Sequence, residues 1–176
     1  LRLSMLTELA RKHRLPIAYC NCVGANDQLV FDGNSLLISA GGELLLRGAA
    51  FSAEHRVGSL RSLPCSADFG PEEEALEQAL VLGVRDYVRK CGFRSVVLGL
   101  SGGIDSAVVA CIAAAALGPE NVLGVTMPTE FSSVGSVSDS EHLARALGIR
   151  FLNIPDRKST RLNSSHEWIS RMPSSA

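Results

Sequence analysis

The feature that most constrains this chain is the stretch VVLGLSGGIDSAVVACIAAAALG, residues 96–118. An apolar run leads into Ser-Gly-Gly-Ile-Asp-Ser, and a segment of Ala, Val and Ile that is long enough for a helix follows. This order predicts a buried strand, a tight loop and a helix that begins at Ile104. Ligands of doubly wound sheets bind at such strand-to-helix loops, so we expect a binding site there.

The loop has the chemistry of a phosphate-binding site. The N-terminus of the following helix offers unpaired N–H groups and a partial positive charge. Gly102 and Gly103 let the backbone approach a ligand closely, and Ser101 and Ser106 add hydroxyl donors. Two common phosphate motifs are excluded, because neither G-x-x-x-x-G-K-[ST] nor G-x-G-x-x-G is present here.

A serine hydrolase is a minor alternative. Residues 99–103, Gly-Leu-Ser-Gly-Gly, satisfy the G-x-S-x-G nucleophile elbow, and Asp139 and His142 follow in the chain order of a hydrolase. However, these two residues lie three positions apart in one predicted helix, whereas a triad needs its Asp to orient the His from a separate loop. We therefore expect His142 to be an exposed helix residue.

The flanking segments predict an α/β fold. Strands are expected over 94–100, 121–127 and 149–155, with helices over 104–117 and 138–147 between them. This strand–helix–strand–helix–strand order is typical of a doubly wound parallel sheet. A further helix opens at Pro71 and ends at Gly92. Its expected apolar face consists of Leu76, Leu80, Val84, Tyr87 and Val88.

The first third of the chain predicts one helix and several short strands. Residues 1–13 favour a helix, residues 17–23 a strand, and Gly41-Gly42 the turn of a hairpin. Cys20 and Cys22 lie inside the expected strand, and we interpret them as small buried hydrophobes. From residue 53 to 71 the periodicity fades into Ser, Gly, Pro and charged residues, which indicates a linker.

Composition and charge indicate no particular class of binding partner. The net charge is -1, which gives no reason to expect nucleic acid or a membrane surface as a partner. No apolar run reaches membrane-spanning length, and residues 1–14 lack the apolar region of a signal peptide. The odd count of 5 cysteines without a secretory signal favours reduced thiols and a cytoplasmic location.

The tail differs from the rest of the chain. Residues 156–166 read DRKSTRLNSSH, which is the in-frame translation of a DNA adapter used in sequencing libraries. The continuation to residue 176 has no amphipathic period. We therefore expect residues 156–176 to be an adapter-derived segment without ordered structure, and we exclude it from functional reasoning.

The loop resembles the S-G-G-x-D-S loop of the ATP pyrophosphatases, a superfamily that includes GMP synthetase and asparagine synthetase. The neighbouring sequence narrows the resemblance. TMPTEFSSVGSVSDSEHLARALGI, residues 126–149, resembles the corresponding segment of the glutamine-dependent NAD⁺ synthetase family. AYCNCVGANDQLVFDG, residues 18–33, independently resembles the end of the nitrilase-like glutaminase domain of that family. A GMP synthetase-like ATP pyrophosphatase remains the alternative within the superfamily.

The resemblance implies two partial domains. The expected fold is the C-terminal part of a nitrilase-like αββα layer, joined to a partial doubly wound, Rossmann-like sheet of the adenine nucleotide alpha hydrolase type. The expected boundaries are 1–52 for the glutaminase part, 53–71 for the linker, 72–155 for the synthetase part and 156–176 for the tail. The glutaminase nucleophile of the family precedes the matched region, so we assign no catalytic residue and expect this chain by itself to bind nucleotide at most.

The resemblance also implies a reaction and a site. Members convert deamido-NAD⁺ to NAD⁺ with ATP, Mg²⁺ and ammonia from glutamine, through an adenylate and release of pyrophosphate, and the parent enzyme is expected to be a homo-oligomer. Asp105 would hold Mg²⁺, and Ser132 and Ser133 have a weaker claim to the site. The residues expected to bind ATP or pyrophosphate are Gly99, Leu100, Ser101, Gly102, Gly103, Ile104, Asp105, Ser106, Thr126 and Met127.

Overall fold

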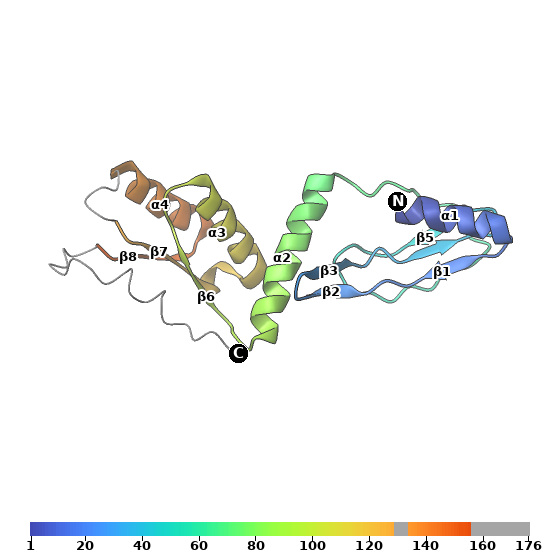
Figure 1. Ribbon diagram of the computed structural model, residues 1–176, viewed down its shortest axis with the longest axis horizontal. Coiled ribbons are helices and arrows are strands. Elements are labelled where there is room, and N and C mark those ends of the chain that lie inside the picture. Colours follow the sequence, from blue (N-terminus) through green and yellow to red (C-terminus); the bar gives the residue numbers. More distant parts are fainter. Residues whose placement is uncertain (129–133, 156–176) are drawn as a thin grey trace, which may run out of the picture.

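The computed structural model describes residues 1–128 and 134–155. Its elements form two groups, one on each side of the long helix α2 (Glu72–Lys90) (Figure 1). The first group contains helix α1 and two antiparallel sheets, and the second contains a parallel sheet and its helices. The predicted α/β architecture with a parallel sheet is confirmed. The expected tail, residues 156–176, lies outside the described residues.

In the first group, one helix covers one face of a three-stranded sheet. The sheet has the strand order β1-β4-β5, and the bounds are α1 (Arg2–His13), β1 (Ile17–Tyr19), β4 (Leu36–Ile38) and β5 (Leu44–Arg47). Leu6 and Ala10 lie one turn apart on α1 and pack with Ile38 in a buried cluster. The predicted hairpin across Gly41-Gly42 is confirmed, because Gly42 takes a φ of 81° that glycine adopts without strain.

The second antiparallel sheet is a separate hairpin. It consists of β2 (Val23–Asn26) and β3 (Leu29–Asp32), joined by a turn at Asp27 and Gln28. The predicted continuous strand over 17–23 is wrong, because the chain leaves β1 after Tyr19 and enters this different sheet at Val23.

Cys20-Asn21-Cys22 connects the two sheets. The Asn21 side-chain amide donates to the Asp32 carboxylate at 2.9 Å and to the Gly33 carbonyl at 2.8 Å. These bonds turn Asn21 toward the protein and replace the regular ladder of a strand. Both cysteines are exposed, so our interpretation of them as buried hydrophobes is wrong.

Asp32 is the centre of a polar network in the first group. Arg2 on α1 donates to its two carboxylate oxygens at 2.8 and 3.2 Å, and Asn21 and Asn34 each donate at 2.9 Å. Burial by itself would raise the pKa of Asp32, but the hydrogen bonds from Arg2 and Asn34 outweigh it and hold the pKa below its usual range. The network fixes α1 relative to the first strands through charge-assisted bonds.

We expect Asp32→Asn to lower the free energy of unfolding by about 2 kcal/mol at pH 7, because the amide presents N–H donors to groups that need an acceptor. A depressed folded pKa gives stability that is complete above the unfolded value of about 3.9 and is lost as the pH falls through the folded pKa. The difference between wild type and variant should therefore shrink below about pH 4. Urea unfolding at pH 7 and pH 3 measures this, with the exposed Asp27→Asn as control, and an unchanged difference would contradict it.

The segment 53–71 runs along the first sheet. The Cys65 N–H donates to the Leu44 carbonyl on β5 at 2.8 Å. The Arg47 guanidinium carbon lies 4.2 Å from the centroid of the Phe69 ring, within the range of a cation–π contact. These contacts hold the segment against the antiparallel sheet, and its assignment as a linker between domains stays a prediction.

Helix α2 buries a different set of side chains from the one its periodicity predicts. Of the expected apolar face, Val88 is buried, whereas Leu76, Leu80 and Tyr87 are exposed. Leu82 is buried instead. The reason is that α2 contacts both the β2–β3 hairpin and helix α3. Its buried side chains therefore do not lie on a single face of the helix.

The second group has the predicted strand and helix order. Its elements are β6 (Val96–Gly99), α3 (Ile104–Leu117), the 3-10 helix η1 (Pro119–Asn121), β7 (Val122–Thr126), α4 (Val134–Leu147) and β8 (Arg150–Asn153). The strands are parallel and lie in the order β6-β7-β8. Helix α3 has its predicted start, whereas α4 begins four residues before the expected position 138.

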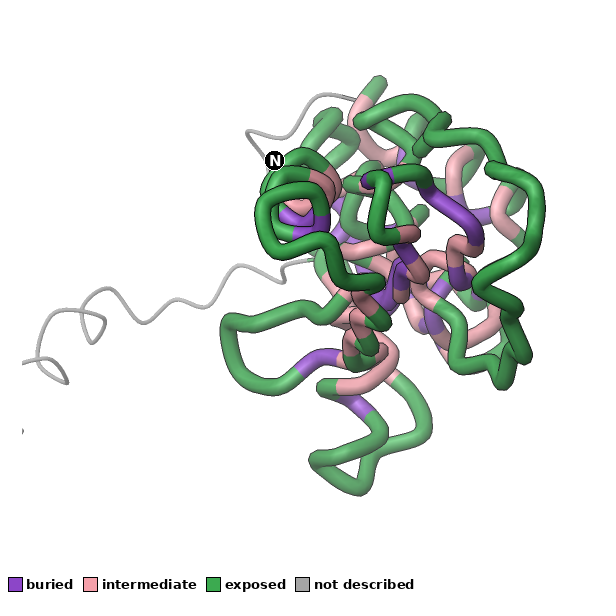
Figure 2. Tube along the Cα trace, turned by 90° about the vertical axis from the view of Figure 1, so that its right-hand side faces the viewer, coloured by how far each residue is buried: buried purple, intermediate pink, exposed green. Residues whose placement is uncertain are grey.

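The core of the second group lies between this sheet and its helices. Leu100 and Val122 from the sheet pack against Ala110 and Ala144 from α3 and α4. Figure 2, in which the first group faces the viewer, shows how the buried segments of the chain are surrounded by exposed and half-buried turns. Successive right-handed crossovers in one direction place both helices on the same face of the sheet. In the described residues the other face stays open, and Val97 is 70% exposed, so the prediction of a fully buried strand is wrong there.

Candidate functional site

The Ser-Gly-Gly-Ile-Asp-Ser loop lies at the carboxyl end of the parallel sheet. It follows β6 directly and leads into α3, which begins at Ile104. The Leu100 N–H donates to the Val125 carbonyl at 2.8 Å, so the chain enters the loop beside the end of β7. Leu100 is buried and anchors the loop, whereas Ser101, Gly102 and the residues up to Asp105 are exposed.

Two serines hold the loop in shape. Their hydroxyl oxygens, Ser101 Oγ and Ser106 Oγ, lie 3.1 Å apart. Ser106 Oγ donates to the Gly103 carbonyl at 2.9 Å, and the Gly103 N–H donates to Ser101 Oγ at 3.3 Å. The loop is therefore closed by its own hydrogen bonds before any ligand arrives, and a preorganised loop loses less entropy on binding.

Gly102 brings a second helix to the loop. It has a φ of 78°, and a Cβ placed on it would lie 2.7 Å from both the Cα and the carbonyl oxygen of Ser136, in the first turn of α4. The N-terminal ends of α3 and α4 therefore meet at this loop, and both contribute partial positive charge there. The sequence does not reveal this contact, because the expected start of α4 at residue 138 lies after Ser136 and no local pattern indicates that Gly102 contacts another helix.

Asp105 lies in the first turn of α3 and is exposed. Within the described residues its side chain forms no hydrogen bond or ion pair, so its carboxylate is available to a ligand. Residues 1–128 and 134–155 contain no cluster of three or more His, Cys, Asp or Glu side chains able to hold a metal ion. One free carboxylate fits Mg²⁺ that arrives with phosphates, because Mg²⁺ is commonly held by one or two carboxylates and phosphate oxygens.

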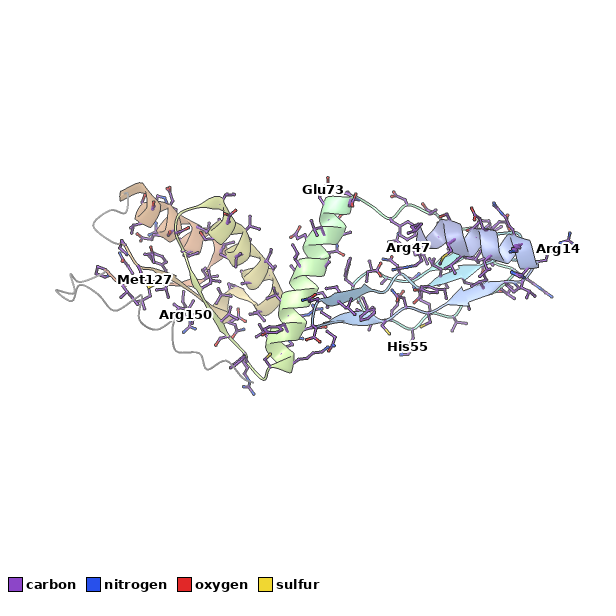
Figure 3. The ribbon with its side chains drawn as sticks, in the orientation of Figure 1. Arg14, Arg47, His55, Glu73, Met127 and Arg150 are labelled. Atoms are coloured by element: carbon purple, nitrogen blue, oxygen red, sulfur yellow. The ribbon has the colours of Figure 1, made fainter. Side chains whose placement is uncertain are left out.

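Thr126 and Met127 lie beside the loop, at the end of β7. Thr126 is 5% exposed and its carbonyl accepts a hydrogen bond from Ile154 at 2.9 Å, whereas Met127 is 64% exposed. In Figure 3, Met127 and Arg150 mark opposite ends of the parallel sheet. Of these two residues, both of which were expected to bind ATP or pyrophosphate, Met127 has the accessible side chain.

The remaining predicted positions are the hydrolase candidates Asp139 and His142, the loop residues Ser101 and Gly99, and the pair Ser132 and Ser133. His142 is an exposed residue of α4, as expected, and Asp139 lies on the same helix. The hydroxyl partner of Ser101 within the described part of the chain is Ser106 and not a histidine. At Gly99 a Cβ would meet nothing within 4 Å, so packing does not require glycine there. Ser132 and Ser133 lie outside the described residues.

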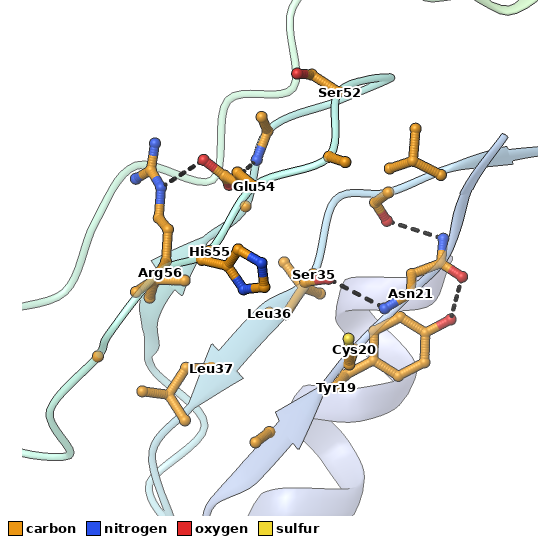
Figure 4. Close-up of a pocket in the computed structure, with 18 residues that line it drawn as sticks. Tyr19, Cys20, Asn21, Ser35, Leu36, Leu37, Ser52, Glu54, His55 and Arg56 are labelled. Carbon is orange, nitrogen blue, oxygen red and sulfur yellow. Dashed lines mark hydrogen bonds and ion pairs between the residues drawn. The ribbon is translucent and has the colours of Figure 1, made fainter.

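A separate cavity of about 540 Å³ lies on the first antiparallel sheet, near Cys20 and His55 (Figure 4). Glu54 at its edge accepts hydrogen bonds from the Ala49 N–H and from Arg56, and these lower the pKa of Glu54. No hydrogen bond joins Cys20 to His55 in the described residues, so the thiol and base of a nucleophilic cysteine are not assembled here.

The sequence profile of the NAD synthase family matches residues 76–168, which include the whole loop and both helices that meet there. The chain belongs to the NAD synthase family. The matched segment contains most of α2, the parallel sheet and its helices, so the family assignment covers the second group of elements. Of the described helices, none is long and apolar enough to cross a membrane.

Curated relatives in this family match both groups of elements. A glutamine-dependent NAD(+) synthetase of Synechocystis sp. is 44% identical over 167 residues, which cover 88% of this chain and 29% of the relative. Another from Aquifex aeolicus is 43% identical over 189 residues, which cover 86% of this chain and 33% of the relative. The chain thus spans about a third or less of the length of these relatives.

A solved structure shares the fold over the same extent. It is a glutamine-dependent NAD+ synthetase from Acinetobacter baumannii in complex with adenosine diphosphate, 38% identical in sequence, with a TM-score of 0.82. The match covers 88% of this chain and 30% of that one. NAD synthase members therefore place both groups of elements in one polypeptide.

Proposed function

We propose that this chain carries the ATP-binding loop of a glutamine-dependent NAD⁺ synthetase. The observation that supports the proposal most strongly is the exposed stretch 101–105, where the N-terminal ends of α3 and α4 meet in a chain of the NAD synthase family. Adenosine diphosphate in the Acinetobacter baumannii relative supports an adenine nucleotide as the ligand. The family match favours this function over a GMP synthetase-like enzyme, and the Ser101–Ser106 pairing disfavours a hydrolase.

The proposed reaction forms an amide in two steps. The nicotinate carboxylate of deamido-NAD⁺ attacks the α-phosphorus of ATP, which gives an adenylate and releases pyrophosphate. Ammonia from glutamine then attacks the activated carbonyl and displaces AMP. The first step places negative charge on the leaving pyrophosphate, and preorganised N–H donors at that point stabilise the transition state.

The loop residues have distinct proposed roles. The backbone N–H groups at the start of α3 and the hydroxyls of Ser101 and Ser106 bind the phosphates. Gly102 and Gly103 keep side chains out of the space that the phosphates need. Asp105 would hold Mg²⁺ together with phosphate oxygens, and the ion supplies charge neutralisation to the leaving group when bound. Met127 packs against the adenine ring.

Nucleotide binding to the 176-residue chain tests the proposal directly. We expect calorimetric titration with ATP and Mg²⁺ to show saturable binding, weakened about tenfold or more by Asp105→Asn. Glu120→Gln serves as control, because Glu120 is an exposed acid at the C-terminal end of α3, far from the loop. Binding that is absent, or equally weakened by both variants, would contradict the proposed site.

A further inference from the structure

The β2–β3 hairpin contacts α2 through the backbone N–H and carbonyl of one residue of β2, Ala25. Asp86 Oδ2 accepts a hydrogen bond from the Ala25 backbone N–H at 2.9 Å, and Lys90 Nζ donates to the Ala25 carbonyl. Asp86 and Lys90 are four positions apart, so they project from the same side of α2. Ala25 is 6% exposed, which places this contact inside the junction between the two groups of elements.

The contact completes an otherwise open sheet edge. Among the described residues β2 pairs with β3 alone, so one of its edges has no neighbouring strand there. Backbone groups at such an edge need partners when they are buried. Here a carboxylate and an ammonium from α2 take the place of the carbonyl and N–H of a third strand. Recognition is thus directed at the backbone and depends little on the side chain at position 25.

Small residues on both surfaces allow the close approach. Gly24 has a φ of 137°, and a Cβ placed on it would lie 3.3 Å from Asp86 Oδ2. On the helix, a Cβ at Gly83 would lie 3.7 Å from a methyl group of Val30 on β3. The hairpin therefore fits against α2 at a place where each surface lacks a side chain.

We propose that Asp86 and Lys90 form a backbone clamp that docks the β2–β3 hairpin on α2 and holds the two groups of elements as one body. Helix α2 also packs against α3, which carries the loop at its N-terminus. The clamp thereby fixes the loop relative to the antiparallel sheets. This inference stands on the Ala25 contacts and does not depend on the proposed function.

Nuclear magnetic resonance of the 18.7 kDa chain tests the clamp. In the wild type, ¹⁵N relaxation should give one rotational correlation time for both groups. In Asp86→Ala we expect two different correlation times and exchange of the Ala25 amide with solvent at least tenfold faster. Glu73→Ala is the control, because Glu73 lies at the far end of α2 from the hairpin (Figure 3). One shared correlation time in Asp86→Ala would overturn the proposal.

Three further variants cover the case in which Asp86→Ala does not fold. Lys90→Met removes the ammonium and keeps the aliphatic stem, and it should also separate the two correlation times. Lys90→Arg keeps a donor for the Ala25 carbonyl and should restore a single value. Arg89→Met removes a neighbouring exposed charge and should have no effect. Identical behaviour of Lys90→Met and Arg89→Met would equally overturn the clamp.

Discussion

Replacing Asp105 with Asn in the full-length enzyme is expected to leave the fold intact and to lower the rate of amide formation by about 100-fold or more. Asn has nearly the same shape, but it lacks the charge that the proposed site needs for Mg²⁺. Metal assistance to such a step is typically worth several kcal/mol, and each ~1.4 kcal/mol changes a rate about tenfold. Because Asp105 has no partner within the described residues, no structural bond is lost.

Two comparisons separate this defect from other causes. The loss should be the same with free ammonia as with glutamine, because it arises in adenylation and not in ammonia supply. Ser101→Ala should be milder, since backbone N–H groups at the α3 N-terminus still bind the phosphates. A serine hydrolase would show the reverse order, with Ser101→Ala inactive and Asp105→Asn nearly unaffected. Pyrophosphate release measures both variants, and full activity of Asp105→Asn would exclude the ATP pyrophosphatase mechanism.

Gly102→Ala is expected to be the most disruptive single-methyl change in the loop. Its Cβ would lie 2.7 Å from the backbone of Ser136, and its φ of 78° is strained for any residue with a Cβ. Backbone atoms of a helix cannot move aside as a flexible side chain can. We therefore expect α4 to shift away from the loop, with ATP binding weakened at least tenfold and the free energy of unfolding lowered by about 1–3 kcal/mol.

Gly99→Ala is the matched control for this change. Gly99 lies in the same strand-to-loop region, yet a Cβ there would meet no atom of residues 1–128 or 134–155 within 4 Å. We expect it to bind ATP as the wild type does and to unfold at the same urea concentration within error. If Gly102→Ala were as harmless as Gly99→Ala, the approach of α4 to the loop would not matter for the site.

Local sequence patterns were sufficient to predict the strand, the loop and the helix at the start of the second group. The apolar run before the loop, the glycines within it and the Ala-rich segment after it fix a strand, a tight turn and a helix from Ile104 to Leu117. These are short-range effects of burial, backbone freedom and helix propensity. The same residues carried the resemblance to the NAD synthetases, which the family match confirms.

Signals of this kind failed where distant contacts decide the outcome. Cys20 and Cys22 have the pattern of a strand, but the amide of Asn21 binds Asp32 and Gly33 and draws the chain out of β1. Leu76 and Leu80 have the spacing of a buried helical face, but α2 lies between two neighbours and buries Leu82 instead.

The sequence by itself determined which residues form the loop and what chemistry they offer, because side-chain type and backbone freedom are properties of the residues themselves. Only the tertiary structure decided that the first turn of α4 meets the loop at Gly102 and that Asp86 and Lys90 bind the backbone N–H and carbonyl of Ala25. These pairs are separated by more than thirty positions in the chain. Which of many possible partners a side chain meets at that separation depends on how whole elements pack, because no local preference favours one over another.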